Sequence, residues 1–178
     1  MEDSEAAERN IGIDARVDLN TELVALLPRL RRFARALARN AHDADDLVQL
    51  ALERALARAS QARADAPLAA WVFGILRHAW IDELRTRGRR TRLFAPEEAG
   101  AEAGDATHAT HVEVLSVQQA LARLPEEQRS AVALVLIEGL SYKEAAHVMQ
   151  VPIGTLTSRL ARARGAADDA RCGLRKER

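Results

Sequence analysis

Residues 121–167 read LARLPEEQRSAVALVLIEGLSYKEAAHVMQVPIGTLTSRLARARGAA. Within this stretch, Ser141 followed three residues later by Glu144 forms a capping box, a pattern that satisfies free N–H groups at the start of a helix. The apolar spacing stops at 150–154, which holds a proline and a glycine, and a helical register resumes over 155–167. The stretch therefore predicts a helix-turn-helix.

The second helix of this pair combines arginine and hydroxyl side chains, and no acidic residue precedes Asp168. Such a helix can lie among the phosphates and base edges of the DNA major groove. Its polar side chains are those of Thr155, Thr157, Ser158, Arg159, Arg162 and Arg164. We therefore expect this helix to contact DNA.

The composition of the 178 residues predicts an all-helical protein. Of these residues 48% are apolar, which allows one sizeable domain or two small ones. Ala, Leu and Arg dominate, Gly and Pro are few, and no long run alternates between apolar and polar residues as a strand would.

Charge is distributed unevenly, although the formal net charge is zero. Residues 1–20 carry −4, 21–92 carry +6, 93–111 carry −4 and 112–178 carry +2. Two basic blocks around an acidic spacer suggest two contacts with a polyanion. We expect the following division: a mobile acidic arm over 1–20, a helical domain over 21–92, a linker over 93–111, a second helical domain over 112–170 and a tail over 171–178.

Three helices are expected in the first block. The first begins near Glu22, and we expect most of the arginines between its apolar positions to form a solvated face. The second runs to about Ala59 with Asp43 as its cap. The third runs from Leu68 to about Arg87, and a polar loop precedes it. The acidic start of the second helix would repel nucleic acid, so it is either ordinary capping or a surface for a basic protein partner.

Aromatic residues gather on the third of these helices. Trp71, Phe73 and Trp80 lie within ten residues, and arginines crowd the end of the helix. Aromatics at helical spacing usually belong to a core. Aromatic rings beside arginines also suit single-stranded or locally melted nucleic acid, because bases stack on rings while guanidinium groups hold the backbone.

Other classes of protein find little support in the sequence. The single Cys172 excludes an intramolecular disulfide and a cysteine-based zinc site. The five histidines show no metal or catalytic-triad spacing, so we expect no catalytic residue, no metal and no cofactor. There is no signal-peptide pattern and no apolar run long enough to span a bilayer, so a cytoplasmic location is expected.

Three motifs together resemble the bacterial sigma factors of the sigma-70 family, specifically the small extracytoplasmic-function type with regions 2 and 4 only. Residues 42–56, HDADDLVQLALERAL, resemble the helix of region 2 that grips the polymerase clamp. Residues 70–90, AWVFGILRHAWIDELRTRGRR, resemble its promoter-opening helix. Region 4 is matched by the stretch quoted first. The resemblance covers residues 22–168, most of the chain.

The resemblance implies an all-α fold of two small helical domains, regions 2 and 4, joined by a flexible linker. It implies a transcription initiation factor that binds the beta-prime clamp and beta flap of core RNA polymerase and directs the enzyme to promoter DNA. It further implies an anti-sigma factor as a partner and no small-molecule substrate.

The resemblance also assigns roles to residues. The polymerase-binding residues would be Asp43, Asp45, Asp46, Leu47 and Gln49. The residues that melt and hold the minus-10 element would be Arg63, Asp65, Phe73, Arg77, His78, Trp80 and Arg85, with Trp71 serving mainly the core. The minus-35 element would be read by the six residues of the recognition helix named above, with Arg164 on phosphate.

Departures from the family pattern keep a second function open. Leu50 and Leu52 stand where the clamp helix often has Glu and Phe, and Thr157 stands where a basic residue is common. A sigma-like decoy that sequesters an anti-sigma factor without driving transcription is therefore the alternative. A one-domain repressor would leave about ninety residues without a role, and an enzyme is the least supported reading.

Overall fold

The structure is a computed structural model that describes residues 2–38, 40–62, 67–94 and 112–176; of 2–18, 91–94, 112–117 and 167–176 it describes the backbone only. Every element in these ranges is helical, as predicted. The elements are α1 (Glu2–Leu37), α2 (Ala41–Ala57), the short 3-10 turn η1 (Ala59–Gln61), α3 (Leu68–Phe94), α4 (Val112–Arg123), α5 (Glu126–Val132), the π-helical turn η2 (Ala133–Ile137), α6 (Tyr142–Met149) and α7 (Ile153–Lys176).

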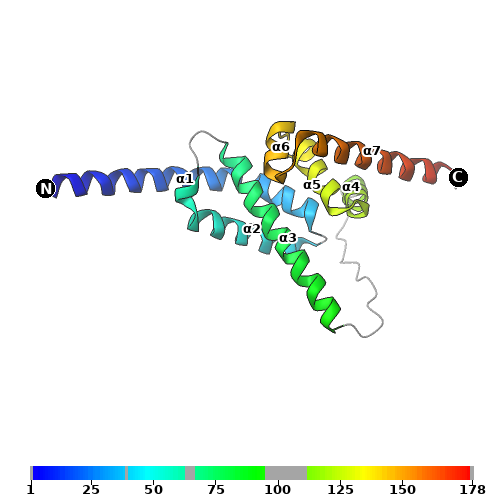
Figure 1. Ribbon diagram of the computed structural model, residues 1–178, viewed down its shortest axis with the longest axis horizontal. Helices are drawn as coiled ribbons and strands as arrows, with labels where there is room; N and C mark the ends of the chain where they lie inside the picture. Colours follow the sequence, from blue (N-terminus) through cyan, green and yellow to red (C-terminus); the bar gives the residue numbers. More distant parts are fainter. Residues whose placement is uncertain (1, 39, 63–66, 95–111, 177–178) are drawn as a thin grey trace.

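Helices α1, α2 and α3 pack on one another and form the first half of the molecule (Figure 1). Two boundaries differ from the prediction. Helix α1 begins at Glu2 rather than near Glu22, because adding residues to an existing helix gains one hydrogen bond for each residue fixed. Helix α3 continues to Phe94, beyond the predicted end near Arg87. The linker predicted over 93–111 falls, from residue 95, outside the described residues.

The cap of α2 is Asn40, and the prediction of Asp43 was wrong. The Asn40 side-chain oxygen accepts a hydrogen bond from the Asp43 backbone N–H at 2.7 Å. Asn40 has extended backbone geometry, as a capping residue requires. The Asp43 carboxylate is thereby left for a different contact.

The second half contains the predicted helix-turn-helix. Gly139 adopts φ +70° before α6, a left-handed conformation that glycine tolerates without strain. Ser141 and Glu144 form the predicted capping box at the start of α6. Gln150, with φ 54°, ends α6 in the left-handed region, and α7 begins three residues later. The turn between the two helices is therefore short.

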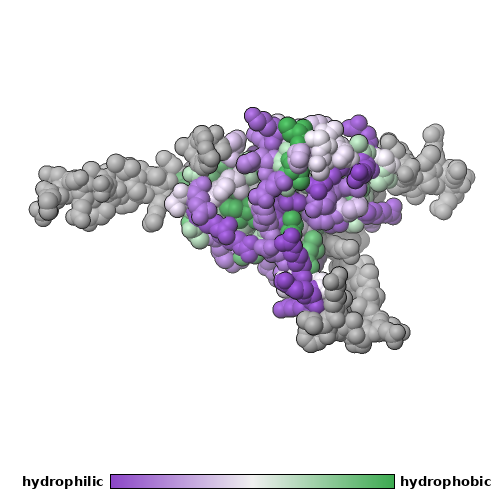
Figure 2. Space-filling model, viewed as in Figure 1, coloured by the Kyte–Doolittle hydropathy of each residue, from purple (hydrophilic) through white to green (hydrophobic). Residues whose placement is uncertain are grey.

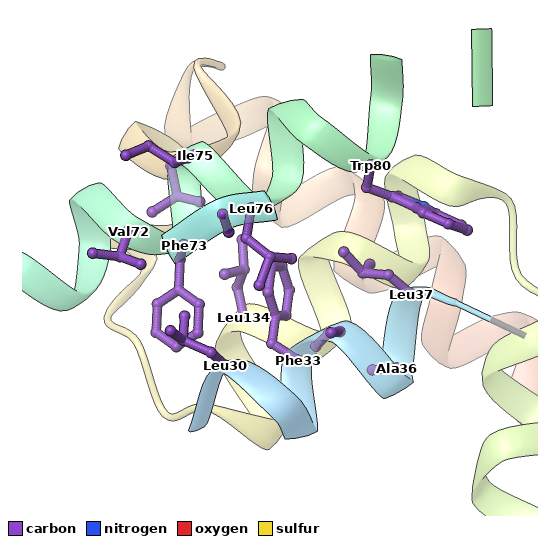
Figure 3. Close-up of a cluster of buried hydrophobic side chains, with 14 of the residues drawn as sticks. Leu30, Phe33, Ala36, Leu37, Val72, Phe73, Ile75, Leu76, Trp80 and Leu134 are labelled. Carbon is purple, nitrogen blue, oxygen red and sulfur yellow. The ribbon is translucent and has the colours of Figure 1, made fainter. Parts of the chain in front are cut away.

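The two halves share one hydrophobic core. Leu134 of η2 lies among Leu30 and Phe33 of α1 and Phe73 and Leu76 of α3, and all five side chains are fully buried (Figure 3). Helix α6 also packs on α3, and α4 and α5 pack on α1. The regions expected to be separate domains are therefore packed together in this structure.

Candidate nucleic-acid interface

Helix α7, which we expected to contact DNA, presents a polar face to solvent. Leu156 and Ala163 on its opposite face are buried, which agrees with the helical register expected over 155–167. The side chains left exposed are those of Thr157, Ser158, Arg162 and Arg164, whereas Thr155 and Arg159 are partly buried. Of the six polar residues expected to contact DNA, these four are therefore the ones open to a DNA groove in this structure.

The two hydroxyl groups on this face bond to the helix itself. Thr157 Oγ1 donates to the Ile153 carbonyl oxygen at 2.9 Å, and Ser158 Oγ donates to the Thr155 carbonyl oxygen at 2.9 Å. Such local bonds use the hydroxyl hydrogen and leave oxygen lone pairs that can accept a further bond. Both hydroxyl groups can therefore still accept a hydrogen bond from a base.

Arg159 points elsewhere. Its Nη1 lies 2.7 Å from Glu127 Oε2 of α5, and its side chain is only 20% exposed. In this conformation it is an internal ion-pair partner rather than an open DNA contact.

Phe73 on α3 is a core residue. It is fully buried, and its ring meets that of Phe33 edge-on, with centroids 5.2 Å apart and an interplanar angle of 80°. The Arg29 guanidinium lies over the Phe73 ring at 5.3 Å. Trp71, which we expected to serve mainly the core, is only partly buried. Trp71 also packs against the core, and of the two rings it is the one that keeps exposed surface.

Trp80 and Arg77, also on α3, each contact an acidic residue of α5. The Trp80 Nε1–H donates to Glu126 Oε2 at 3.0 Å, and Arg77 Nη2 lies 3.4 Å from Glu127 Oε2. The two residues are 4% and 5% exposed. Burial lowers the pKa of Arg77, while the nearby Glu127 and Glu126 carboxylates raise it; its guanidinium still carries its charge at neutral pH.

The remaining minus-10 candidates are scattered. His78 Nδ1 lies 2.7 Å from the Gly74 carbonyl oxygen, so this nitrogen carries the hydrogen in that contact. Arg85 is exposed and lies 3.7 Å from Asp82. Arg63 and Asp65 lie outside the described residues. Residues 87–90 of α3 are exposed and include Arg87, Arg89 and Arg90, and Figure 2 shows the hydrophilic surface of this part of the helix.

The acidic start of α2 borders an open groove of about 170 Å³ between α2 and α3. Arg87 Nη1 donates to Asp43 Oδ2 at 2.7 Å, and this bond is the main cause that lowers the pKa of Asp43. Asp45, Asp46 and Gln49 are exposed, but Leu47 is buried in the core. The groove is lined by Asp43, Asp46, Leu47, Leu50, Ala79, Trp80, Glu83 and Arg87.

Sequence reasoning missed the residues that join the two halves. Glu138 has a fully buried side chain, with Oε2 3.1 Å from Arg29 Nε and Oε1 3.3 Å from Arg32 Nε. The expectation that most arginines of α1 form a solvated face holds for Arg31, Arg32 and Arg35, which are exposed, whereas Arg29 is partly buried. The sequence signal for this contact was limited to the position of Glu138, an acidic residue at the end of an apolar run and directly before Gly139.

The described part of the chain contains neither a cluster of metal-binding side chains nor a membrane-spanning helix. In these ranges, no group of three or more His, Cys, Asp or Glu residues is placed to hold a metal ion. None of the helices described is both long and apolar enough to cross a membrane.

Two family models match the chain. Residues 115–166 match "Sigma-70, region 4", and residues 23–77 match "Sigma2 domain of PhyR". The first match covers the helix-turn-helix with α5, and the second covers α2, most of the packed part of α1 and the first ten residues of α3.

Curated relatives and a solved structure resemble most of the chain. It is 38% identical over 146 residues to the ECF RNA polymerase sigma factor EcfG of Rhodopseudomonas palustris, covering 82% of this chain and 81% of that one. It is 38% identical over 136 residues to SigM of Mycobacterium tuberculosis, covering 76% and 68%. The sigma factor RpoE of Bartonella quintana, solved in complex with the anti-sigma factor NepR, has a TM-score of 0.77 at 34% identity and covers 85% of this chain and 95% of its own.

Proposed function

The chain belongs to the extracytoplasmic-function sigma factors of the sigma-70 family, and we propose that it binds core RNA polymerase and directs the enzyme to specific promoters. One observation carries the proposal: the relationship to EcfG extends over 82% of the chain and includes both halves. The chemistry of bond formation then belongs to the polymerase, and no catalytic residue is assigned to this chain.

We assign DNA binding to two surfaces, one on α7 and one on α3. Ser158 and Arg162 on the exposed face of α7 read the minus-35 element in the major groove, and Arg164 contacts phosphate. On α3, Trp71 and the exposed Arg85 meet the minus-10 element directly, with Arg77 and Trp80 joining them once α5 has moved away. Phe73 supports this helix from within the core.

The exposed acids at the start of α2 form the contact with polymerase. Asp45, Asp46 and Gln49 face solvent, whereas the buried Leu47 holds the helix in place. Asp43 forms an ion pair with Arg87 at the edge of the groove between α2 and α3. A basic surface on the beta-prime clamp would complement these acids, and the beta flap would bind region 4.

An anti-sigma factor is the expected inhibitor. The Bartonella quintana relative was solved in complex with the anti-sigma factor NepR, and its similarity spans 85% of this chain. The expected location is the cytoplasm, where the polymerase and its promoters lie.

A binding experiment with core polymerase tests the polymerase contact. The labelled chain is titrated with core enzyme of the source bacterium and followed by fluorescence anisotropy, for the wild type and for Asp45→Asn with Asp46→Asn. We expect about tenfold weaker binding of the double variant, equivalent to about 1.4 kcal/mol. Glu53→Gln, on the same helix and exposed, is the matched control and should bind as the wild type does. If wild-type chain and core form no complex, the proposal fails.

The covered state of α3 favours one second candidate, a decoy that binds an anti-sigma factor without driving transcription. Arg77, Trp80 and Arg159 are all engaged within the chain. A decoy would bind the anti-sigma factor tightly and yield no promoter-dependent transcript with core polymerase.

A further inference from the structure

Two neighbouring acids of α5 occupy the DNA-facing groups of α3. Glu126 accepts the Trp80 indole hydrogen through Oε2, and its Oε1 accepts from Ser130 Oγ at 2.6 Å. Glu127 faces Arg77. Trp80 and Arg77 thus meet carboxylates where promoter DNA would bring bases and phosphates.

The same Glu127 carboxylate also reaches the recognition helix. Its Oε2 lies 2.7 Å from Arg159 Nη1 and 3.4 Å from Arg77 Nη2. One carboxylate oxygen therefore bridges an arginine of the minus-35 surface and an arginine of the minus-10 surface. The Glu127 carboxylate therefore acts on both proposed DNA surfaces, the one on α7 and the one on α3.

Further polar contacts reinforce the closed arrangement away from the DNA surfaces. Glu138 binds Arg29 and Arg32 of α1 through its fully buried carboxylate. Arg129 Nη1 donates to the Leu37 carbonyl oxygen at 2.9 Å, in a buried position at the end of α1. Both contacts join residues about a hundred positions apart, so they hold the two halves together rather than stabilising either half alone.

The closed arrangement cannot serve a promoter. The two promoter elements are named for positions 25 base pairs apart, which at 3.4 Å per base pair corresponds to roughly 85 Å of duplex. Here α3 and α6 are packed in direct contact. The halves must separate before α3 and α7 can hold both elements.

Acids in the first turn of a helix are common because they stabilise the helix dipole, and this alone would explain their presence in α5. It does not explain their direction, since both carboxylates turn toward the other half of the molecule. Arg77 Nε is moreover buried without a hydrogen-bond partner among the described residues, which leaves α3 incompletely satisfied in the closed state. Separation would return this donor to water or to a phosphate.

We propose that Glu126 and Glu127 form an autoinhibitory latch, which closes the chain on itself and occupies Arg77, Trp80 and Arg159 in place of DNA until polymerase separates the two halves. The latch rests on the proposed function, because it regulates the same DNA surfaces. Carboxylates and phosphates compete for the same donors, so the latch lowers the affinity of the free chain for DNA. It prevents the free factor from occupying promoters without polymerase.

Distance measurement between the halves tests the latch without reference to transcription. Spin labels are placed at Ala57→Cys on α2 and Lys143→Cys on α6, both exposed positions, in a Cys172→Ser background. Double electron–electron resonance should give one short distance for the closed chain. With Glu126→Gln and Glu127→Gln a second, longer population should appear. The matched control, Glu22→Gln with Glu53→Gln, removes the same charge from exposed positions and should keep the short distance alone.

Binding of a fluorescein-labelled 20-nucleotide oligo-dT strand tests the competition with DNA. The latch variant should bind roughly fivefold more tightly than the charge-matched control, as expected if the open fraction rises from about a tenth to about a half. Circular dichroism verifies that each variant keeps its helix content. An unchanged distance distribution, or equal DNA affinity of the latch variant and its control, overturns the latch. Failure of the chain to bind core polymerase would overturn the proposed function instead and leave the distance result standing.

Discussion

Phe73→Ala should destabilise the whole protein rather than weaken a DNA contact. The Phe73 side chain is fully buried against Phe33, beneath Arg29. Truncating a buried phenylalanine to alanine costs about 3–5 kcal/mol in lost burial and cavity formation. For a chain of this length each kcal/mol lowers the melting temperature by about 2–4 °C, so a decrease of about 6–20 °C is expected.

Urea denaturation followed by circular dichroism at 222 nm measures the loss, and a thermal scan gives the melting temperature. Leu84→Ala is the control on the same helix, because Leu84 is 36% exposed and its truncation should cost less than about 1 kcal/mol. If Phe73→Ala lost no more stability than Leu84→Ala, and instead weakened binding of melted minus-10 DNA, the placement of Phe73 in the core would be refuted.

Three smaller effects should follow from the helix caps and their charges. Asn40→Ala should lower stability by about 1 kcal/mol, seen as a lower urea midpoint, because α2 loses its cap; no change would contradict the capping role. Ser141→Ala should cost about 0.5–2 kcal/mol through the loss of the capping box, whereas Ser158→Ala on α7 should cost less than about 0.5 kcal/mol. The Ser141 hydrogen bonds lower the pKa of Glu144 below its ordinary 4.5, so the stability they provide is present above that pH and is lost as the pH falls through the lowered value. Urea midpoints between pH 7 and pH 3 should therefore fall less steeply for Ser141→Ala, and equal slopes would contradict the cause.

Local patterns in the sequence predicted what depends on local chemistry. The capping box at Ser141 and Glu144 and the break after α6 were both predicted, because each arises from residues that are neighbours in the chain. The helical register expected over 155–167 agrees with the burial of Leu156 and Ala163 on one face of α7. These parts of the site could be predicted from the sequence because neighbouring residues decide where a helix begins and ends.

Contacts between distant residues could not be predicted in the same way. Whether Phe73 or Trp71 faces the core depends on where α1 and η2 pack, and helical spacing alone fits either choice. The pairing of Arg29 with Glu138 spans 109 positions, and nothing near either residue distinguishes it from a solvated charge. The role of Glu126 could not be predicted from its neighbours in the chain, because its bond to Trp80 exists only when the two halves meet.

Run-off transcription tests the central claim most directly. Purified chain is combined with core polymerase on fragmented genomic DNA that includes its own upstream region, and the transcripts are sequenced. We predict transcripts that begin at a shared promoter sequence and fall by about 5- to 150-fold with Arg162→Ala, the loss expected for one bidentate base contact of about 1–3 kcal/mol. Arg123→Ala, an exposed arginine outside the helix-turn-helix, should leave them unchanged. The absence of any transcript that depends on the wild-type chain would contradict the account.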